Sequence, residues 1–281
     1  MIRKYSLSHL SALDLTPLEL LILAEKIGYD FAGLRLLPPE RGIPAYQIAD
    51  NNIAIKEISS FLDNSNVKIL DIEVYKLHPL RPVNEKSAFF EAGAVMGARN
   101  VLVIAPSGFG LIELSEHFSI LCEYLVQYNL TANLEFMSWT GVKDIVSAIN
   151  LMELSGWPVN ARILIDTFHF YTSKSEMAHI LKIPSDRIDY IQVSDTGPIF
   201  TQSEAKIKYH SRNFRLVPGD GCIDLQSIIS AIPPTAVLSF EAWNKYETRS
   251  LGTERWAEVA LKRLKHFDMT LSSQSSLRQT A

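Results

Sequence analysis

The sequence has little cysteine and no long apolar run. Its 281 residues include only two cysteines, Cys122 and Cys222. Two cysteines build neither a disulfide framework nor a zinc knuckle, so we expect reduced thiols in a cytoplasmic protein. No stretch reaches the roughly 20 apolar residues of a membrane span, and the first residues lack the apolar core of a signal peptide. We therefore expect no membrane partner.

The chain also lacks a block of basic residues. Lysine and arginine number 27 against 31 acidic residues, which gives a formal net charge of -4. Because nucleic-acid binding depends on clustered cations that face phosphates, no nucleic-acid partner is expected. A local basic strip around Arg212 and Arg215 is the one exception. The share of hydrophobic residues, 47%, and of charged residues, 21%, is ordinary for a globular protein.

Short apolar runs alternate with helical patterns from one end of the chain to the other. The runs lie at 4–10, 31–37, 67–77, 100–105, 131–138, 161–170, 187–194 and 236–243. Helices are predicted at 17–27, 48–63, 83–97, 111–128, 141–155 and 175–182, from 224 onward, and at 253–266. Alternating strands and helices imply parallel pairing through right-handed crossovers. Runs such as VLVIA, RILID and VLSFE are as apolar as buried parallel strands should be.

These strand–helix units predict an α/β fold, a closed (β/α)8 TIM barrel, for which about 250 residues are typical. An open doubly wound sheet would carry a glycine-rich phosphate-binding motif after its first strand, where this chain has SLSHLSALDL. No linker rich in proline and glycine divides the chain. We expect a single barrel domain at 1–267, a frayed polar tail at 268–281 and one long irregular loop at 195–222.

Side chains with oxygen donors end four consecutive runs. They are Glu135 in NLEF, Asp166 in LIDTFH, Gln192 in YIQVSD and Glu241 in LSFE. The C-terminal ends of barrel strands meet at the face where chemistry takes place. Buried carboxylates in one pocket are costly unless they are paired or bind a metal. The pattern predicts a divalent cation, Mn2+ or Mg2+, with Co2+ and Zn2+ as alternatives. Any one of these acids alone would suit a helix cap or an arginine partner instead.

Other polar residues near the strand ends are candidates for substrate contact. His169 lies three residues beyond Asp166, and metal binding or a satisfied loop histidine are its alternatives. Arg212 and Arg215 precede the Pro-Gly turn of SRNFRLVPGDG and can donate paired hydrogen bonds to a carboxylate or phosphate, unless they lie on a solvated surface loop. Further candidates are Arg35 and Glu73 in the same pocket, His9 at the first strand end, and Asp195 as a contact behind Gln192 or a loop residue.

The order LEF, IDTFH, IQVSD, PGDG, SFE resembles the xylose-isomerase-like barrel superfamily over nearly the full chain. The opening SHLSALDLTPLELLILAEKIGYDFAGLRLLP resembles its sugar phosphate isomerase/epimerase members. The resemblance implies that Glu135, Asp166 and Glu241 bind the metal. It implies that Glu135 and Glu241 also move protons on opposite faces of the substrate. It further implies that His169 and an arginine of the 195–221 loop contact the substrate.

One position departs from the commonest pattern of that superfamily. Many of its epimerases have histidine where this chain has Gln192. Glutamine there, followed by SRxxRxxPGxG, is similar to the 3-dehydroshikimate dehydratase branch. Glutamine supplies a carbonyl oxygen, so the metal site is compatible with the change, while a simple sugar-epimerase assignment is less well supported.

Residues and resemblance together predict a metal-dependent isomerase or epimerase of a sugar, sugar phosphate or keto-polyol. It would transfer protons through a metal-stabilised enediolate. The first alternative is a lyase of the 3-dehydroshikimate dehydratase type. An apurinic-site endonuclease shares the barrel but gathers several histidines, and a non-catalytic barrel would bind only metal or polyol. The expected partner is a small polyol or keto acid, and a homo-oligomer is compatible with such a barrel.

Overall fold

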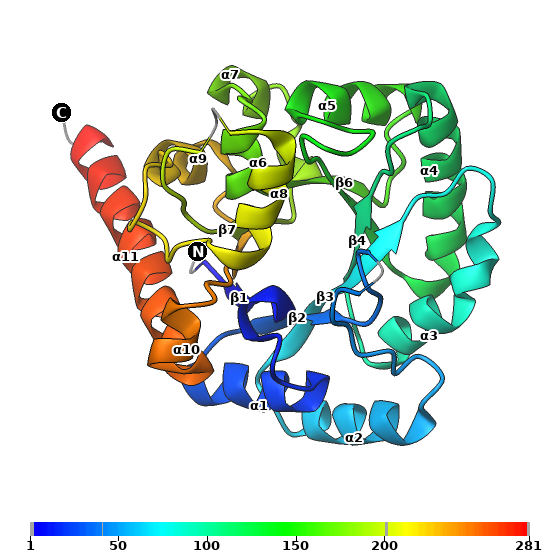
Figure 1. Ribbon diagram of the computed structural model, residues 1–281, viewed down its shortest axis with the longest axis horizontal. Coiled ribbons are helices and arrows are strands. Elements are labelled where there is room, and N and C mark those ends of the chain that lie inside the picture. Colours follow the sequence, from blue (N-terminus) through cyan, green and yellow to red (C-terminus); the bar gives the residue numbers. More distant parts are fainter. Residues whose placement is uncertain (1–2, 41, 200–201, 280–281) are drawn as a thin grey trace.

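The computed structural model describes residues 3–40, 42–199 and 202–279, and its centre is a closed barrel of eight parallel strands (Figure 1). Neighbouring strands follow the order of the chain, and the last strand pairs with the first. The strands are β1 Tyr5–Leu7, β2 Phe31–Arg35, β3 Lys68–Lys76, β4 Asn100–Ile104, β5 Thr131–Glu135, β6 Ala161–Asp166, β7 Tyr190–Val193 and β8 Val237–Phe240. The predicted single-domain TIM barrel is confirmed.

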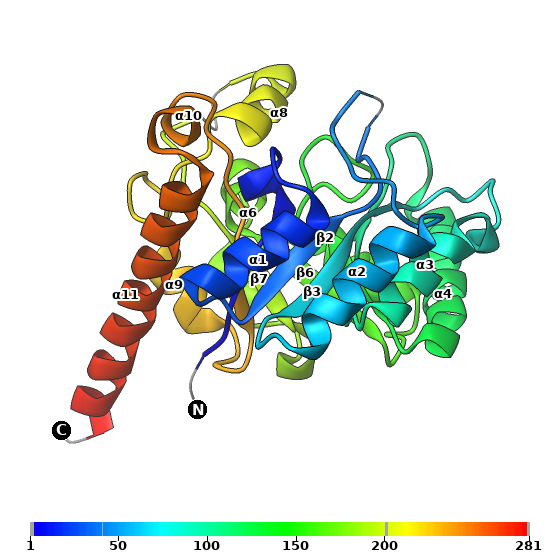
Figure 2. The same cartoon turned by 90° about the horizontal axis from the view of Figure 1, so that it is seen from below.

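Helices surround the barrel, and Figure 2 shows α8 and α10 at one end of it. The α-helices are α1 Pro17–Ile27, α2 Asn52–Asp63, α3 Ser87–Val95, α4 Leu111–Leu125, α5 Ile145–Leu154, α6 Thr167–Thr172, α7 Met177–Ile180, α8 Glu204–Asn213, α9 Leu225–Ala231, α10 Glu247–Leu251 and α11 Thr253–Gln279. Short 3-10 turns are η1 His9–Ala12, η2 Val83–Lys86, η3 Val126–Tyr128 and η4 Ser185–Arg187. Within the described ranges, no helix combines the length and apolarity needed to cross a bilayer.

The first helix illustrates how local sequence fixes these bounds. The Thr16 side chain accepts a hydrogen bond from the Glu19 backbone, and the Glu19 side chain accepts one from the Thr16 backbone. This reciprocal cap satisfies two amide groups that have no partner within the helix. Pro17 occupies the first turn, where a missing N–H costs nothing. Gly28 ends the helix with a φ of 93°, a left-handed conformation that favours glycine.

Alternation along the strands separates two apolar layers. In β4, Val101 and Val103 belong to the large cluster that packs against the helices, while Leu102 and Ile104 belong to a smaller cluster. Because successive strand residues point to opposite faces, the smaller cluster fills the barrel interior. The predicted site residues occupy the alternate strand positions whose side chains point into the barrel. In β5, for example, Ala132 and Leu134 pack outward, so Glu135 points inward.

Three expectations are corrected. The 195–222 segment is not irregular throughout, because α8 lies inside it; residues 200–201 fall outside the described residues. The last helix does not end near 266 before a frayed tail but continues to Gln279, and residues 280–281 fall outside the described residues. The sixth strand ends at Asp166, not at 170, because the Asp166 carboxylate accepts a hydrogen bond from the His169 backbone and caps α6.

Candidate active site

The four predicted metal ligands lie at one end of the barrel. Glu135 and Asp166 are the last residues of β5 and β6, Gln192 lies in β7, and Glu241 directly follows β8. Asp166 and Gln192 pair in register, so they are neighbours on adjacent strands. Their exposed fractions are 6% for Glu135, 0% for Asp166, 1% for Gln192 and 5% for Glu241. The strand ends therefore concentrate polar groups where solvent does not reach.

Glu135, Asp166 and His169 form a compact donor cluster. One donor atom from each lies within 4.8 Å of the others. The His169 Nε2 atom is 3.7 Å from Glu135 Oε1, and the His169 ring packs edge-on against Trp139 with a centroid separation of 5.0 Å. His169, which the sequence placed at the substrate, thus also stands beside two of the predicted metal ligands.

Arg215 is buried beneath this cluster. Its Nη1 donates to Asp166 Oδ2 over 2.5 Å and to the Glu241 backbone carbonyl over 3.0 Å. Its Nη2 lies 3.3 Å from His169 Nε2. Burial lowers the pKa of Arg215, but the charges of Asp166 and Glu241 outweigh burial and raise it. Arg215 is therefore a fixed cation that balances the buried Asp166 carboxylate.

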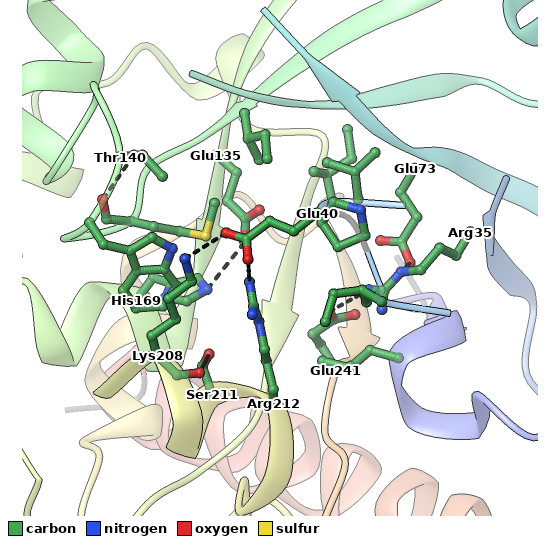
Figure 3. A pocket seen from close by; sticks show the side chains of 18 of the residues that line it. Arg35, Glu40, Glu73, Glu135, Thr140, His169, Lys208, Ser211, Arg212 and Glu241 are labelled. Carbon is green, nitrogen blue, oxygen red and sulfur yellow. Dashed lines mark hydrogen bonds and ion pairs between the residues drawn. The ribbon is translucent and has the colours of Figure 1, made fainter. Parts of the chain in front are cut away.

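A second group lies on the other side of the pocket in Figure 3, around Glu241. Arg35 Nε donates to Glu73 Oε1 over 2.9 Å, and Arg35 Nη2 is 3.9 Å from Glu241 Oε1. The Ser8 hydroxyl donates to Glu241 Oε2. Arg35 and Glu73, both predicted to face the pocket, do so as an ion pair.

Glu135 and Glu241 share an electrostatic property that suits proton transfer. Burial raises the pKa of Glu135 well above its usual value, and the Asp166 charge adds to the rise. Burial likewise raises the pKa of Glu241, and the Glu73 charge adds to the rise. A carboxyl group whose pKa is raised holds its proton more tightly, which makes it a stronger base when it is ionised.

A cavity of about 900 Å³ opens above these residues. Such a volume lies in the range of small-molecule sites. The predicted residues that line it are Arg35, Glu73, Glu135, His169, Arg212, Arg215 and Glu241. Apolar walls come from Leu102, Ile104, Met137, Trp139 and Trp243. Asp166 and Gln192 do not line the cavity. They would therefore affect a ligand only indirectly, through a bound metal or through the side chains that they hold in place.

Gln192 provides a test of whether the residues fit a cation. Its Oε1 atom is buried and accepts no hydrogen bond within the described part of the chain. A buried oxygen without a partner is costly, and a bound cation would satisfy it. Glu135, Asp166 and Gln192 supply oxygen donors, and His169 can add nitrogen, a set that suits Mn2+, Mg2+, Co2+ or Zn2+. The residues present therefore fit a divalent metal.

Two other residues predicted from the sequence, His9 and Asp195, form hydrogen bonds to the backbone around the site. His9 is buried, accepts a hydrogen bond from the Arg35 backbone at Nδ1 over 2.9 Å, and stacks on Tyr46. Asp195 accepts hydrogen bonds from the backbone amides of Gly219 and Ile223, so it holds the Pro-Gly turn. Neither side chain lines the cavity.

Arg212 lies at the rim on α8, where it meets two residues that sequence reasoning missed. Its Nη2 is 3.0 Å from Glu40 Oε2, and Lys208 Nζ is 2.6 Å from Glu40 Oε1. Glu40 belongs to the loop between β2 and α2, and its sequence context carries no signal that it would reach α8. The spacing of Lys208 and Arg212 could have indicated a shared helix face if α8 had been predicted.

A model of xylose isomerase-like TIM barrels matches residues 21–267, so the chain belongs to this family. The 3-dehydroshikimate dehydratase of Pseudomonas putida is 27% identical over 135 residues, which are 47% of this chain and 20% of that enzyme. The inosose dehydratase of Halalkalibacterium halodurans is 27% identical over 126 residues, which are 43% of this chain and 41% of that enzyme. These matches thus span less than half of each curated relative, and both relatives are enzymes.

Solved structures share the fold. The IolI protein, whose structure contains a bound zinc atom, superposes with a TM-score of 0.77 at 19% identity. The superposition covers 95% of this chain and 99% of IolI. At 19% identity the superposition shows that the two proteins share the fold.

Proposed function

We propose that this protein is a metal-dependent enzyme that removes a proton from the carbon next to a carbonyl group of a small polyhydroxylated substrate. The proposal rests on two buried carboxyl groups, Glu135 and Glu241, that line the same cavity. Beside them lies the donor cluster that fits a divalent metal. The cavity offers room for one small ring or sugar.

The proposed metal ligands are Glu135, Asp166, Gln192 and Glu241, with His169 as a further donor. When bound there, Mn2+, Mg2+, Co2+ or Zn2+ would supply Lewis acidity toward the substrate carbonyl. Arg215 holds the Asp166 carboxylate in place through the 2.5 Å contact, so this ligand is preorganised.

Glu135 and Glu241 are the proposed proton carriers. The Ser8 hydroxyl orients Glu241 by donating to Oε2, which leaves Oε1 on the side of Arg35. The group that is ionised takes the proton from carbon, and the other, present as the carboxylic acid, gives its own proton to the substrate or to the departing hydroxyl group, which leaves as water. Arg35, Glu73, His169 and Arg212 are the proposed substrate contacts.

Loss of water is the favoured outcome of this step. Both curated relatives reported above are dehydratases, and Gln192 sets this chain apart from the commonest epimerase pattern. A proton removed next to the carbonyl leaves an electron pair that can expel a hydroxide from the neighbouring carbon. Epimerisation is the second candidate, because Glu135 and Glu241 come from strands three apart in the barrel and reach the cavity from different sides.

A product assay tests the proposal. The protein, loaded with Mn2+ or Zn2+, is given 3-dehydroshikimate, inosose and a set of keto-sugars. Ultraviolet absorbance detects an aromatic acid, and NMR detects a dehydrated inosose or an epimer. Glu241→Gln and Asp166→Asn should each lower turnover by about 100-fold or more, whereas the exposed Glu57→Gln should not. Full turnover in both site variants would exclude the assigned roles.

A further inference from the structure

We propose that Lys208 and Arg212 form a binding subsite for a substrate carboxylate, and that Glu40 occupies this subsite when no substrate is present. The inference rests on the proposed function and deepens it, because it names an acidic substrate class. Figure 3 shows the Glu40 side chain extending to Arg212 and Lys208 in the same pocket as Glu135 and Glu241.

The contacts of Glu40 are those of a bound carboxylate. Its Oε1 lies 2.6 Å from Lys208 Nζ and its Oε2 lies 3.0 Å from Arg212 Nη2, so each oxygen faces one cation. All three residues line the 900 Å³ cavity. A carboxylate that arrives on a small molecule offers the same two oxygens at the same spacing.

An anion between the two cations relieves their repulsion. Lys208 and Arg212 lie four residues apart on α8, so they share one face of the helix, and like charges at this spacing repel. Ala205 and Tyr209 line the cavity at the same helical period, which identifies this face as the one turned toward the ligand space. A positive helix face directed into a cavity favours an acidic ligand.

The helix that carries these cations is fixed. Directly after α8, Phe214 pairs with Asn244 in an isolated antiparallel bridge, and Lys245 donates its backbone N–H to Asn213 over 2.9 Å. Arg215 Nε donates to the Ser211 carbonyl over 2.7 Å while its Nη1 donates to Asp166. Lys208 and Arg212 are therefore preorganised by the barrel itself.

Glu40 differs from the cations in how it is held. It belongs to the connection between β2 and α2, and its described neighbours in that connection form no helix or strand. The side chains of Glu40, Lys208 and Arg212 are 36%, 32% and 29% exposed, and ion pairs this accessible to solvent are weak. A substrate carboxylate can replace Glu40 without disturbing α8.

Calorimetric titration with shikimate tests the inference. Shikimate carries a carboxylate and ring hydroxyls but no ketone, so binding is measured without turnover, and methyl shikimate is its uncharged match. Glu40→Gln should tighten shikimate binding by about three- to fivefold and leave methyl shikimate unchanged. Arg212→Gln should weaken shikimate binding by about as much, and the double variant should lose the gain from Glu40→Gln. The exposed Glu57→Gln is the matched control.

Two results would overturn the subsite. One is a folded Glu40→Gln protein, checked by circular dichroism, that binds shikimate no better than the wild type. The other is methyl shikimate binding as tightly as shikimate. Failure of the proposed function would look different, because turnover would be absent from the substrate panel while shikimate binding still depended on Glu40 and Arg212.

Discussion

Arg215 and Asp166 form a buried ion pair in which Nη1 and Oδ2 are 2.5 Å apart and the two side chains are 4% and 0% exposed. The pair joins the segment after α8 to the end of β6. The other Asp166 oxygen accepts the His169 backbone N–H that begins α6. Asp166 is thus fixed from two sides before any ligand binds.

Arg215→Gln should destabilise the metal-free protein. Removing one partner of a buried pair leaves an uncompensated charge, here Asp166, and this typically costs about 3–5 kcal/mol. Urea unfolding measures the loss. The exposed pair of Arg255 and Glu258 offers the control, since Arg255→Gln should cost less than about 1 kcal/mol. Equal losses of unfolding free energy in the two variants would show that the buried pair stabilises the protein no more than the exposed pair does.

Gln192→Leu should separate metal binding from folding. Because Gln192 Oε1 accepts no hydrogen bond from any residue that the structure describes, an apolar side chain of similar size should leave the free energy of unfolding of the metal-free protein within about 1 kcal/mol. The affinity for Mn2+ or Zn2+ should fall by about tenfold or more, since even residues behind the ligands contribute this much. Calorimetric metal titration measures it, and an unchanged affinity would remove Gln192 from the ligand set.

The same titration has a matched control inside the barrel. Asn133 is also buried, and within the described ranges its Oδ1 likewise accepts no hydrogen bond, but its Nδ2 donates to Asn100 Oδ1 over 2.9 Å. Asn133→Leu should therefore lower the free energy of unfolding while the metal affinity stays near that of the wild type.

His9 should make stability fall in mild acid. Burial lowers its pKa from 6.5 to about 4. Between these values the unfolded chain binds a proton that the folded chain excludes, so the stability present above pH 6.5 is lost as the pH falls toward 4, by about 3 kcal/mol in total. Urea unfolding at several pH values measures this dependence.

His9→Gln removes that titration and should flatten the pH profile relative to the wild type. A His9→Gln profile as steep as the wild type would mean that other groups cause the acid sensitivity.

The sequence predicted the barrel well because its strands are short apolar runs with a local period. It also placed Glu135, Asp166, Gln192 and Glu241 at one end, since parallel strands bring their C-terminal ends together. The residues that contact these four side chains could not be predicted from the sequence in the same way. Arg215 lies 49 residues from Asp166, and nothing local distinguishes an arginine that holds a buried acid from one that meets a substrate.

Two further features depend on tertiary packing. The polar composition of 195–222 predicted a loop, yet α8 forms there because Ile207 packs with Phe168 and because Phe214, directly after the helix, pairs with Asn244. Glu40 follows two prolines in a polar turn, and only the folded chain brings it to Lys208 and Arg212. Contacts of this kind carry no periodic signal.

Glu135 and Glu241 are proposed to move a proton at the carbon next to a carbonyl group. A substrate labelled with deuterium at that carbon, 3-dehydroshikimate or inosose, measures this step directly, because both water loss and epimerisation release the label into solvent. The metal-loaded wild type should release it, and Glu135→Gln and Glu241→Gln should each slow the release by about 100- to 10,000-fold. Release at the wild-type rate by both variants would show that neither carboxyl group takes part in the proton transfer.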